Sequence, residues 1–240
     1  MAPAPKYTMQ EQELMILDAA EKSIENSSLL DFTMSAIAKG AGLSMGSVYK
    51  HVQSKEDVLI ALAANMYTNE ADMYHTVLTL PLTIPEKIIA TNLIDRNKVH
   101  TYSFEGQLDN LVSSAALLKR GSLMWIERMR NNSKKIEHEF DRLYSDAAQS
   151  GEFISGMAAV EEIGLLFWSL TAGYFQLVRQ HQSLLQGDDA AASGALLALA
   201  PDAPHIRGLK RMLNAYEWRQ PLTQQGIEKA CRLLEEIDFR

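Results

Sequence analysis

The side chains with the most informative chemistry lie between residues 32 and 55, where lysines are interspersed with hydroxyl and apolar groups. This stretch contains no acidic residue, and its basic or titratable side chains are Lys39, Lys50, His51 and Lys55. Lysines neutralise DNA phosphates, and apolar groups contact the methyl group of thymine. The stretch therefore favours binding to nucleic acid, with a solvated basic face as the alternative, although the whole chain carries a net charge of −7.

Two short helices joined by a tight turn are expected to position these side chains. Thr33 can cap the first helix by accepting a backbone N–H bond, and Gly42 suits the positive φ that ends such a helix. Ser44 opens the second helix, in which Val48 and Val52 lie one turn apart and face inward. The side left available to a partner holds Met45, Gly46, Ser47, Tyr49, Lys50 and His51.

A helix is expected on each side of this pair. Leu14, Leu17, Ala20 and Ile24 give the preceding helix an apolar stripe. Residues 54–57, Ser-Lys-Glu-Asp, fit a capping box that starts the following helix, which extends to about His75. These helices are expected to surround one small core.

The segment from about residue 10 to residue 62 resembles the TetR family of transcriptional regulators. The residues that carry the resemblance are Ile16–Ala20, Thr33, Ile37–Ala38, Ala41–Ser44, Gly46–Tyr49, His51–Val52 and Ser54–Leu59. The resemblance implies an all-α fold, with a helix-turn-helix DNA-binding head (residues 1–60) on a larger helical body (residues 61–240) that binds an effector and dimerises. It implies DNA contacts from Thr33, Ser44, Met45, Gly46, Ser47, Tyr49, Lys50, His51 and Lys55.

The implied contacts divide into two kinds. Tyr49 and Lys55 resemble the family's phosphate contacts, whereas Met45, Gly46 and Lys50 lie where base edges are reached. The sequence departs from the family at Met45, where lysine or arginine is common, and it has no arginine before Arg96. Since phosphate neutralisation supplies much of DNA affinity, base recognition is expected to rely more on apolar contacts.

The remaining residues predict a helical body. Helical periodicity is expected at about 85–102, 106–119, 122–149, 158–185, 204–218 and 222–237. The connector at residues 78–85 contains Pro81 and Pro85, which interrupt a helix, and is predicted to act as a hinge between head and body. For residues 187–201, which are rich in small residues, a short helix and a poorly ordered segment both remain open.

The body also carries candidates for a small-molecule site and a dimer interface. Aromatic and methionine side chains gather in the middle helices, where plain core packing is the alternative to contact with a mostly apolar effector. These candidates are Phe104, Met124, Trp125, Arg128, Phe167, Trp168 and Tyr174. The helix at 158–185 is apolar nearly all round, which predicts a homodimer seam built with one or both of the last helices.

Several other classes of function lack support in the sequence. Gly42-Leu-Ser-Met-Gly46 matches the Gly-x-Ser-x-Gly pattern of hydrolases, but no strand is expected before it, so no catalytic residue is assigned. The histidines are scattered without metal-ligand spacing, and no phosphate-binding loop is present, so neither a metal nor a cofactor is expected. The lone Cys231, with no apolar run long enough to span a bilayer, indicates a cytoplasmic protein.

The expected function is a one-component regulator, usually a repressor, that binds a palindromic DNA operator as a dimer and is released by a small effector. Two alternatives remain open. One is a TetR-fold protein that organises the chromosome, and the other is a helical small-molecule-binding protein or enzyme with a vestigial head. Lys39, Lys50 and Lys55 argue against the second alternative.

Overall fold

A computed structural model gives the fold and describes residues 6–184 and 198–240. Within these ranges every regular element is a helix, and one bridge between extended residues joins Phe153 to Trp218. The predicted all-α fold is therefore confirmed. None of the helices in these ranges is long and apolar enough to cross a membrane.

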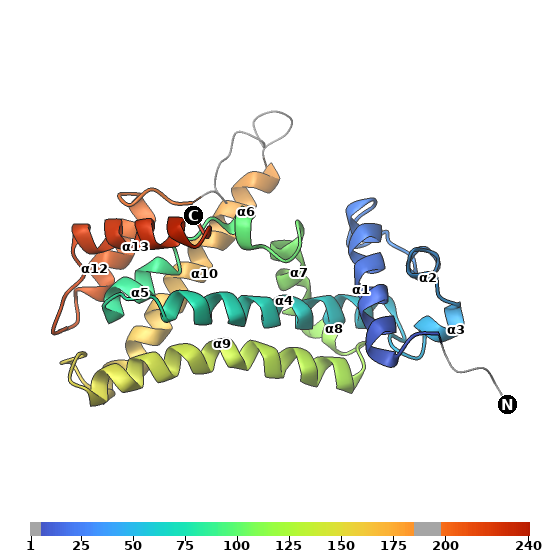
Figure 1. The fold of residues 1–240 in the computed structure, drawn as a ribbon, viewed down its shortest axis with the longest axis horizontal. Coiled ribbons are helices and arrows are strands. Elements are labelled where there is room, and N and C mark those ends of the chain that lie inside the picture. The colour runs from blue at the N-terminus through green and yellow to red at the C-terminus, as the bar shows by residue number, and fades with distance from the viewer. Residues whose placement is uncertain (1–5, 185–197) are drawn as a thin grey trace. The chain divides into compact units, whose positions relative to one another are not determined.

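The helices, labelled in Figure 1, form two compact units. The first unit contains the residues up to Asn69 together with residues 101–134, and the second contains residues 70–100 and 135–240. Helices α4 (Lys55–Leu78) and α9 (Leu123–Gln149) each contribute to both units. The predicted head (1–60) and body (61–240) were defined by DNA binding and effector binding, and this division stays a prediction.

The first unit is built around the helix-turn-helix. Helices α1 (Met9–Glu25), α2 (Met34–Ala41) and α3 (Met45–Val48) share one core with the start of α4, and α7 (Glu105–Val112), α8 (Ala115–Leu118) and the start of α9 add to it. The predicted stripe of α1 is buried at Leu17, Ala20 and Ile24, but Leu14 is 60% exposed. Ile16 takes the buried position instead, because residues 16, 20 and 24 are four positions apart and lie on one face of the helix.

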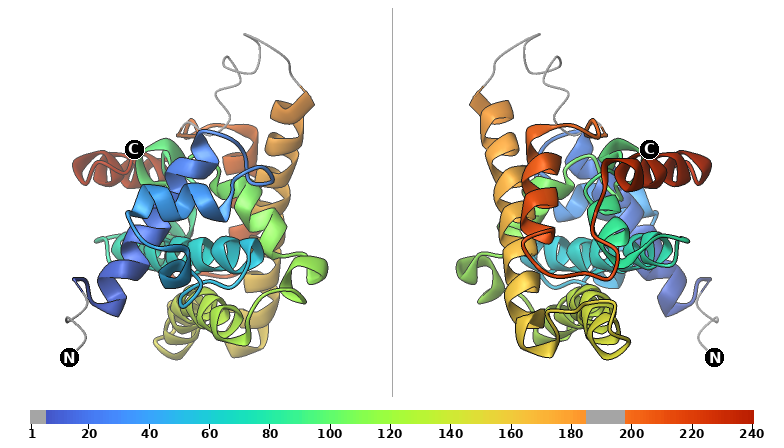
Figure 2. Two further views of the ribbon diagram at one scale, coloured as in Figure 1. Left: turned by 90° about the vertical axis from the view of Figure 1, so that its right-hand side faces the viewer. Right: turned by 90° about the vertical axis from the view of Figure 1, so that its left-hand side faces the viewer.

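The second unit contains two pairs of packed helices and a cluster of aromatic side chains. Helix α5 (Ile84–Ala90) contacts α13 (Gln224–Glu236), and α10 (Val160–Leu184) lies beside α12 (Pro204–Leu213), as Figure 2 shows. Helix α6 (Arg96–Val99) and the 3₁₀-helix η1 (Met157–Ala159) are short. Tyr74, Phe140, Phe167 and Trp168 form an aromatic cluster with ring centroids 4.9–6.2 Å apart.

Three predicted helices are shorter or more divided than expected. The helix expected at 85–102 ends at Ala90, because the Thr91 hydroxyl donates to the Ile88 carbonyl and Asp95 caps α6 by accepting from the Asn97 N–H. The helix expected at 106–119 is split into α7 and α8, and that expected at 204–218 ends at Leu213. Of the undecided stretch 187–201, residues 187–197 lie outside the described ranges and residues 198–200 have no regular structure.

The connector at 78–85 does not separate the two units. Its residues all lie within the second unit, so the predicted hinge is wrong at this position. Lys229 of α13 donates to the Pro81 carbonyl over 2.7 Å, and Glu86 accepts the Thr83 N–H over 2.9 Å. The two prolines interrupt the helix, as expected, but α13 holds the turn that they make.

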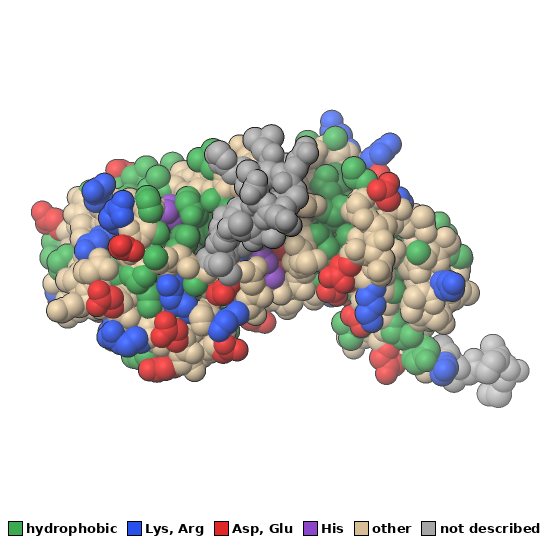
Figure 3. Space-filling view, turned by 90° about the horizontal axis from the view of Figure 1, so that it is seen from above, with side chains coloured by type: hydrophobic (Ala, Val, Ile, Leu, Met, Phe, Trp, Pro, Cys, Tyr) green, Lys and Arg blue, Asp and Glu red, His purple; other side chains and the backbone are tan. Residues whose placement is uncertain are grey.

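The acidic excess of the chain is not spread evenly along it. On the face seen in Figure 3, acidic and basic side chains of the second unit are interspersed with hydrophobic ones. Residues 32–55 of the first unit, in contrast, contain lysines and no carboxylate. The helix-turn-helix segment is therefore locally basic although the whole chain carries a net charge of −7.

Candidate nucleic-acid interface

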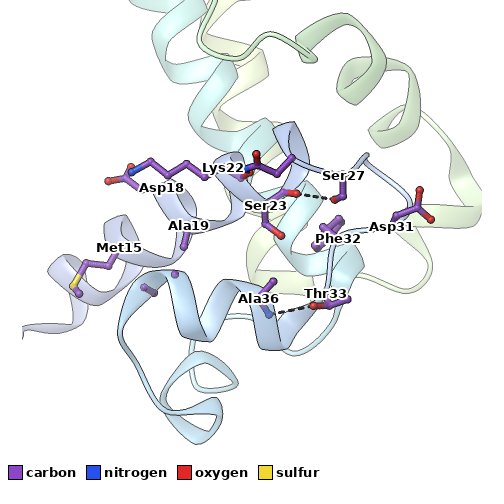
Figure 4. Close-up of a pocket in the computed structure, with 13 residues that line it drawn as sticks. Met15, Asp18, Ala19, Lys22, Ser23, Ser27, Asp31, Phe32, Thr33 and Ala36 are labelled. Atoms are coloured by element: carbon purple, nitrogen blue, oxygen red, sulfur yellow. Dashed lines mark hydrogen bonds between the residues drawn. The ribbon is translucent and has the colours of Figure 1, made fainter.

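The first helix of the motif is capped as the sequence predicts. Thr33 Oγ1 accepts the Ala36 N–H over 3.1 Å, a bond that Figure 4 draws, and it also lies 3.1 Å from Ser35 Oγ. Gly42 ends α2 with φ 64°, which favours glycine over residues with a side chain. The Thr33 hydroxyl is therefore engaged in fixing the start of α2.

The second helix is short and its serines bond to each other. Ser44 caps α3 by accepting the Ser47 N–H over 3.1 Å, and the two side-chain hydroxyls are 2.9 Å apart. Val48 anchors the helix in the core with no exposed surface. Both hydroxyls that were predicted to contact DNA thus serve first to stabilise the N-terminal turn of α3.

Four exposed residues of α3 and its C-terminal end form what we call the reading surface: Met45, Gly46, Tyr49 and Lys50. Met45 is 37% exposed and Tyr49 is 46% exposed. The Tyr49 N–H donates to the Met45 carbonyl over 3.0 Å, so these two side chains lie one helical turn apart on the same face. A β-carbon at Gly46 would meet only Ser44 Oγ, at 3.9 Å, so the helix is open to a partner there.

The expected exposure of His51 is wrong. The side chain is 7% exposed, its Nε2 lies 3.3 Å from Gln12 Oε1, and its carbonyl accepts the Trp125 indole N–H over 2.8 Å. Residue 125 lies far along the chain, so a pattern within α3 could not reveal that α9 covers this histidine. His51 positions the end of the reading surface rather than facing outward.

Lys55 is also held by the fold. Its ammonium group donates to the Leu30 carbonyl over 3.0 Å and lies 4.9 Å above the Phe32 ring. Lys39 on α2 and Lys50 next to Tyr49 are exposed. The turn before α2 therefore already fixes the position of the Lys55 ammonium group, whose contact with a phosphate stays a prediction.

Asp57 is a positioning residue that the sequence did not single out beyond its cap. Its side chain accepts the Gln53 N–H over 2.9 Å and the Ser122 N–H over 2.6 Å, and its own N–H donates to Ser54 Oγ. The carboxyl is 1% exposed. It ties the segment after α3 to the start of α9, and only its capping role was visible in the sequence.

A groove of about 580 Å³ lies between α1 and α2 of the first unit. Figure 4 shows Ala19 and Ala36 inside it, with Asp18, Lys22 and Asp31 at its edges. Gly40 permits this close packing, because a β-carbon there would lie 3.1 Å from the Ala19 β-carbon. Two carboxylates at the edge make the groove a poor site for DNA, so the reading surface remains the candidate interface.

Comparison with known proteins supports the same segment. Residues 16–62 match the family described as bacterial regulatory proteins, tetR family. The HTH-type transcriptional regulator EthR of Mycobacterium tuberculosis (strain CDC 1551 / Oshkosh) is 41% identical over 63 residues, which are 26% of this chain and 29% of EthR. This similarity covers the helix-turn-helix segment of the chain. The matched segment spans less than a third of the length of such curated relatives.

Two solved structures share the fold over most of this chain. NemR of E. coli in its reduced form aligns with a TM-score of 0.55 and 13% identity, covering 87% of this chain and 98% of NemR. FadR from Bacillus subtilis in complex with stearoyl-CoA aligns with a TM-score of 0.51 and 20% identity, covering 76% of this chain and 94% of FadR. At these identities the likeness establishes the fold.

Four of the predicted effector contacts lie in the first unit. Phe104 stacks on Tyr102 with centroids 5.2 Å apart, and burial raises the pKa of Tyr102 to about 12. Trp125 is 1% exposed and bonded to His51, whereas Met124 is 57% exposed. Arg128 pairs with Glu13 over 2.6 Å and lies 4.9 Å from the Trp125 ring. Phe104, Trp125 and Arg128 thus pack within the first unit, Met124 is largely exposed, and contact of any of the four with an effector stays a prediction.

The other three predicted effector contacts lie in the second unit. Phe167 is 1% exposed inside the aromatic cluster, and Trp168 is half-buried beside it. Tyr174 stacks on His205 with centroids 4.0 Å apart, and burial lowers the pKa of His205 to about 4. The His205 imidazole is therefore neutral at pH 7, and a cation, the Arg96 guanidinium, lies over the neighbouring Phe175 ring.

Proposed function

We propose that this chain is a one-component transcriptional regulator, a repressor in its simplest form, whose reading surface enters the major groove of a DNA operator. The observation that carries the proposal is the exposure of Met45, Tyr49 and Lys50. These residues lie within the segment 16–62 that matches the TetR family. A helix-turn-helix places its second helix in the major groove. The absence of carboxylates from residues 32–55 removes repulsion from phosphates.

Genomic footprinting with the purified full-length chain tests this function. A repressor is expected to protect a few palindromic sites near promoters. Protection of many dispersed sites would favour a chromosome-organising protein instead. Failure to protect any site, with small-molecule binding retained, would favour a helical binding protein or enzyme with a vestigial head.

We further propose that the chain acts as a homodimer through α10. The exposed side of this helix carries Leu165, Leu166, Leu170 and Leu177, which are between 39% and 67% exposed. A row of exposed leucines along one helix is typical of a self-association surface. A two-fold dimer can place its reading surfaces about 34–36 Å apart, which matches successive major-groove faces and a palindromic operator.

Charged residues within the leucine row are expected to disrupt this dimer. We predict that Leu166→Asp with Leu170→Asp yields a monomer at micromolar concentration in sedimentation, because two buried carboxylates per subunit cost several kcal/mol. The free energy of unfolding of the monomer should change little, since both leucines are exposed. Leu14→Asp, at an exposed leucine of α1, is the matched control and should remain dimeric. A double variant that stays dimeric contradicts the α10 seam.

The proposed effector is small and mostly apolar, and it binds the second unit near Phe167, Trp168 and Tyr174. The aromatic cluster and the neutral His205 favour an apolar ligand there. FadR, which shares the fold, was solved with stearoyl-CoA, a ligand with an apolar chain. The effector must prefer the DNA-incompetent state, by about 10⁴-fold for a complete switch, because equal affinity for both states shifts nothing.

Titration with long-chain fatty acids and their coenzyme A esters tests the effector site. Tryptophan fluorescence and operator affinity are followed together, in the original chain and in Trp168→Phe. Trp125 and Trp218 are buried elsewhere, so the ligand-dependent signal should disappear in Trp168→Phe. A fluorescence change without a change in operator affinity would mean that the site binds ligand but does not control DNA binding.

Gly46 offers a substitution that separates folding from DNA binding. We predict that Gly46→Ala leaves the fold intact and stabilises α3 by about 0.5–1 kcal/mol, because an added methyl meets nothing closer than 3.9 Å. Operator affinity should fall about tenfold, since the methyl holds the backbone away from the bases. Denaturant unfolding and fluorescence anisotropy measure the two effects. Gly208→Ala, at an equally open glycine of α12, should leave DNA affinity unchanged. Unchanged operator affinity in Gly46→Ala contradicts close backbone approach.

A further inference from the structure

The polar side chains at the start of α3 are used inside the protein. The Ser44 hydroxyl accepts the Ser47 N–H and lies 2.9 Å from the Ser47 hydroxyl, and Thr33 accepts a backbone N–H in the same way in α2. The His51 ring is buried against Gln12. Most groups in this region that could donate to or accept from a base edge are thus engaged within the fold.

The chemistry left on the reading surface is mainly apolar. Residues 45–50, Met-Gly-Ser-Val-Tyr-Lys, include no arginine, asparagine or glutamine, the residues that make most bidentate contacts to guanine and adenine. Met45 offers a flexible thioether and Tyr49 offers a ring, and the two lie one turn apart on a single face. Lys50, beside them, supplies a cationic donor.

Only one base presents an apolar group in the major groove, and that group is the 5-methyl of thymine. Gly46 sits next to Met45 and has no side chain, so the helix can approach a base pair closely enough for a methyl to reach the Met45–Tyr49 face. Donor and acceptor patterns, in contrast, would be matched by Lys50 and the Tyr49 hydroxyl alone. The largest contact that the reading surface can make with a base is therefore apolar.

We propose that the reading surface distinguishes bases chiefly through thymine methyl groups, with Met45 and Tyr49 packing on at least one thymine in each operator half-site. Lys50 then bonds to a neighbouring guanine or phosphate and fixes the register. This inference rests on the proposed DNA binding and names the feature of DNA that the site recognises. It makes Met45 and Tyr49 the residues that determine specificity, and it replaces the phosphate contact that the family resemblance implies for Tyr49 by a base contact.

Replacing thymine by uracil tests the proposal, because uracil lacks the methyl but keeps every hydrogen-bonding group. The full-length chain is used with a palindromic duplex selected from a random pool, and each thymine is replaced in turn. At one or two positions per half-site, uracil should lower affinity about fourfold, as expected for exposing one methyl-sized group. Replacing the symmetric pair should lower affinity about 16-fold.

A double-mutant cycle assigns the effect to Met45. In Met45→Ala the duplexes with thymine and with uracil at the contacted position should bind with nearly equal affinity, whereas Met45→Leu should retain the difference. Met45 is partly exposed, so both variants are expected to fold, and circular dichroism verifies this. Tyr49→Ala is the second cycle at the neighbouring thymine.

The outcomes separate this inference from the proposed function. Tight, sequence-specific binding that ignores uracil, or a uracil effect unchanged in both Met45→Ala and Tyr49→Ala, overturns methyl recognition and leaves DNA binding intact. Failure to select any duplex sequence overturns both the inference and the proposed function.

Discussion

Replacing Asp57 by alanine is expected to lower the free energy of unfolding by about 2–6 kcal/mol, because two backbone donors in the interior lose their acceptor. The carboxyl is 1% exposed and accepts the backbone N–H groups of Gln53 and Ser122. Alanine would leave both donors without this acceptor in the interior, at about 1–3 kcal/mol each. Chemical denaturation followed by circular dichroism measures the loss.

Two further substitutions make the Asp57 experiment specific. Asp57→Asn keeps one carbonyl acceptor and should lose roughly half as much stability as alanine. Asp18→Ala, at an exposed carboxylate of α1, should change the free energy of unfolding by less than about 0.5 kcal/mol. If Asp57→Ala unfolds within about 1 kcal/mol of the original chain, the tie between the α3 segment and α9 does not carry the stability assigned to it.

Lys50→Glu is expected to lower affinity for the selected operator by at least about 100-fold, because like charges brought together at an interface cost several kcal/mol. The variant loses one attraction to DNA and gains one repulsion, and each dimer contains two such sites. Stability should be nearly unchanged, since Lys50 is exposed. Fluorescence anisotropy at fixed salt gives the affinity, and a salt titration should give a less steep slope for the variant.

The control for charge is Lys22→Glu, which makes the same change at an exposed lysine of α1, beside the groove and away from the reading surface. It should weaken binding only slightly, through the long-range field of the protein. Equal losses in Lys22→Glu and Lys50→Glu would mean that total charge, and not contact by α3, determines affinity.

Features that depend on a few neighbouring residues could be predicted from the sequence. The caps at Thr33 and Ser44 and the positive φ of Gly42 are confirmed, because each is a bond or a backbone angle set within four residues. The long helices α9 and α10 were also predictable, because helical periodicity of apolar residues is a pattern of nearby residues. The four residues of the reading surface were also correctly expected to be exposed.

Features that depend on distant residues could not be predicted. His51 is buried because Gln12 and Trp125 reach it from α1 and α9, and Asp57 bonds to Ser122 across 65 positions of the chain. Nothing within α3 or α4 encodes those contacts. The division of the expected helix at 85–102 was missed for a different reason: Thr91 and Asp95 bond to nearby backbone groups, and propensity within a helix window did not weigh that competition.

The aromatic residues illustrate the same limit in the candidate effector site. Trp125 and Trp168 were assigned to one site because both are large, apolar and on middle helices. The structure gives them separate surroundings: Trp125 donates its N–H to His51 in the first unit, and Trp168 joins Phe140 and Phe167 in the second. Composition predicts that such rings are buried, but only the tertiary contacts decide which of them remain available to a ligand.

The most direct test of DNA recognition by the reading surface is one equilibrium titration. Full-length chain is titrated against the selected palindromic duplex and, separately, against the same duplex with its half-site bases scrambled, at physiological salt. We expect the palindrome to bind at least about 10³-fold more tightly, which is the lower end for specific protein–DNA complexes. Equal affinity for the two duplexes would contradict sequence recognition by α3.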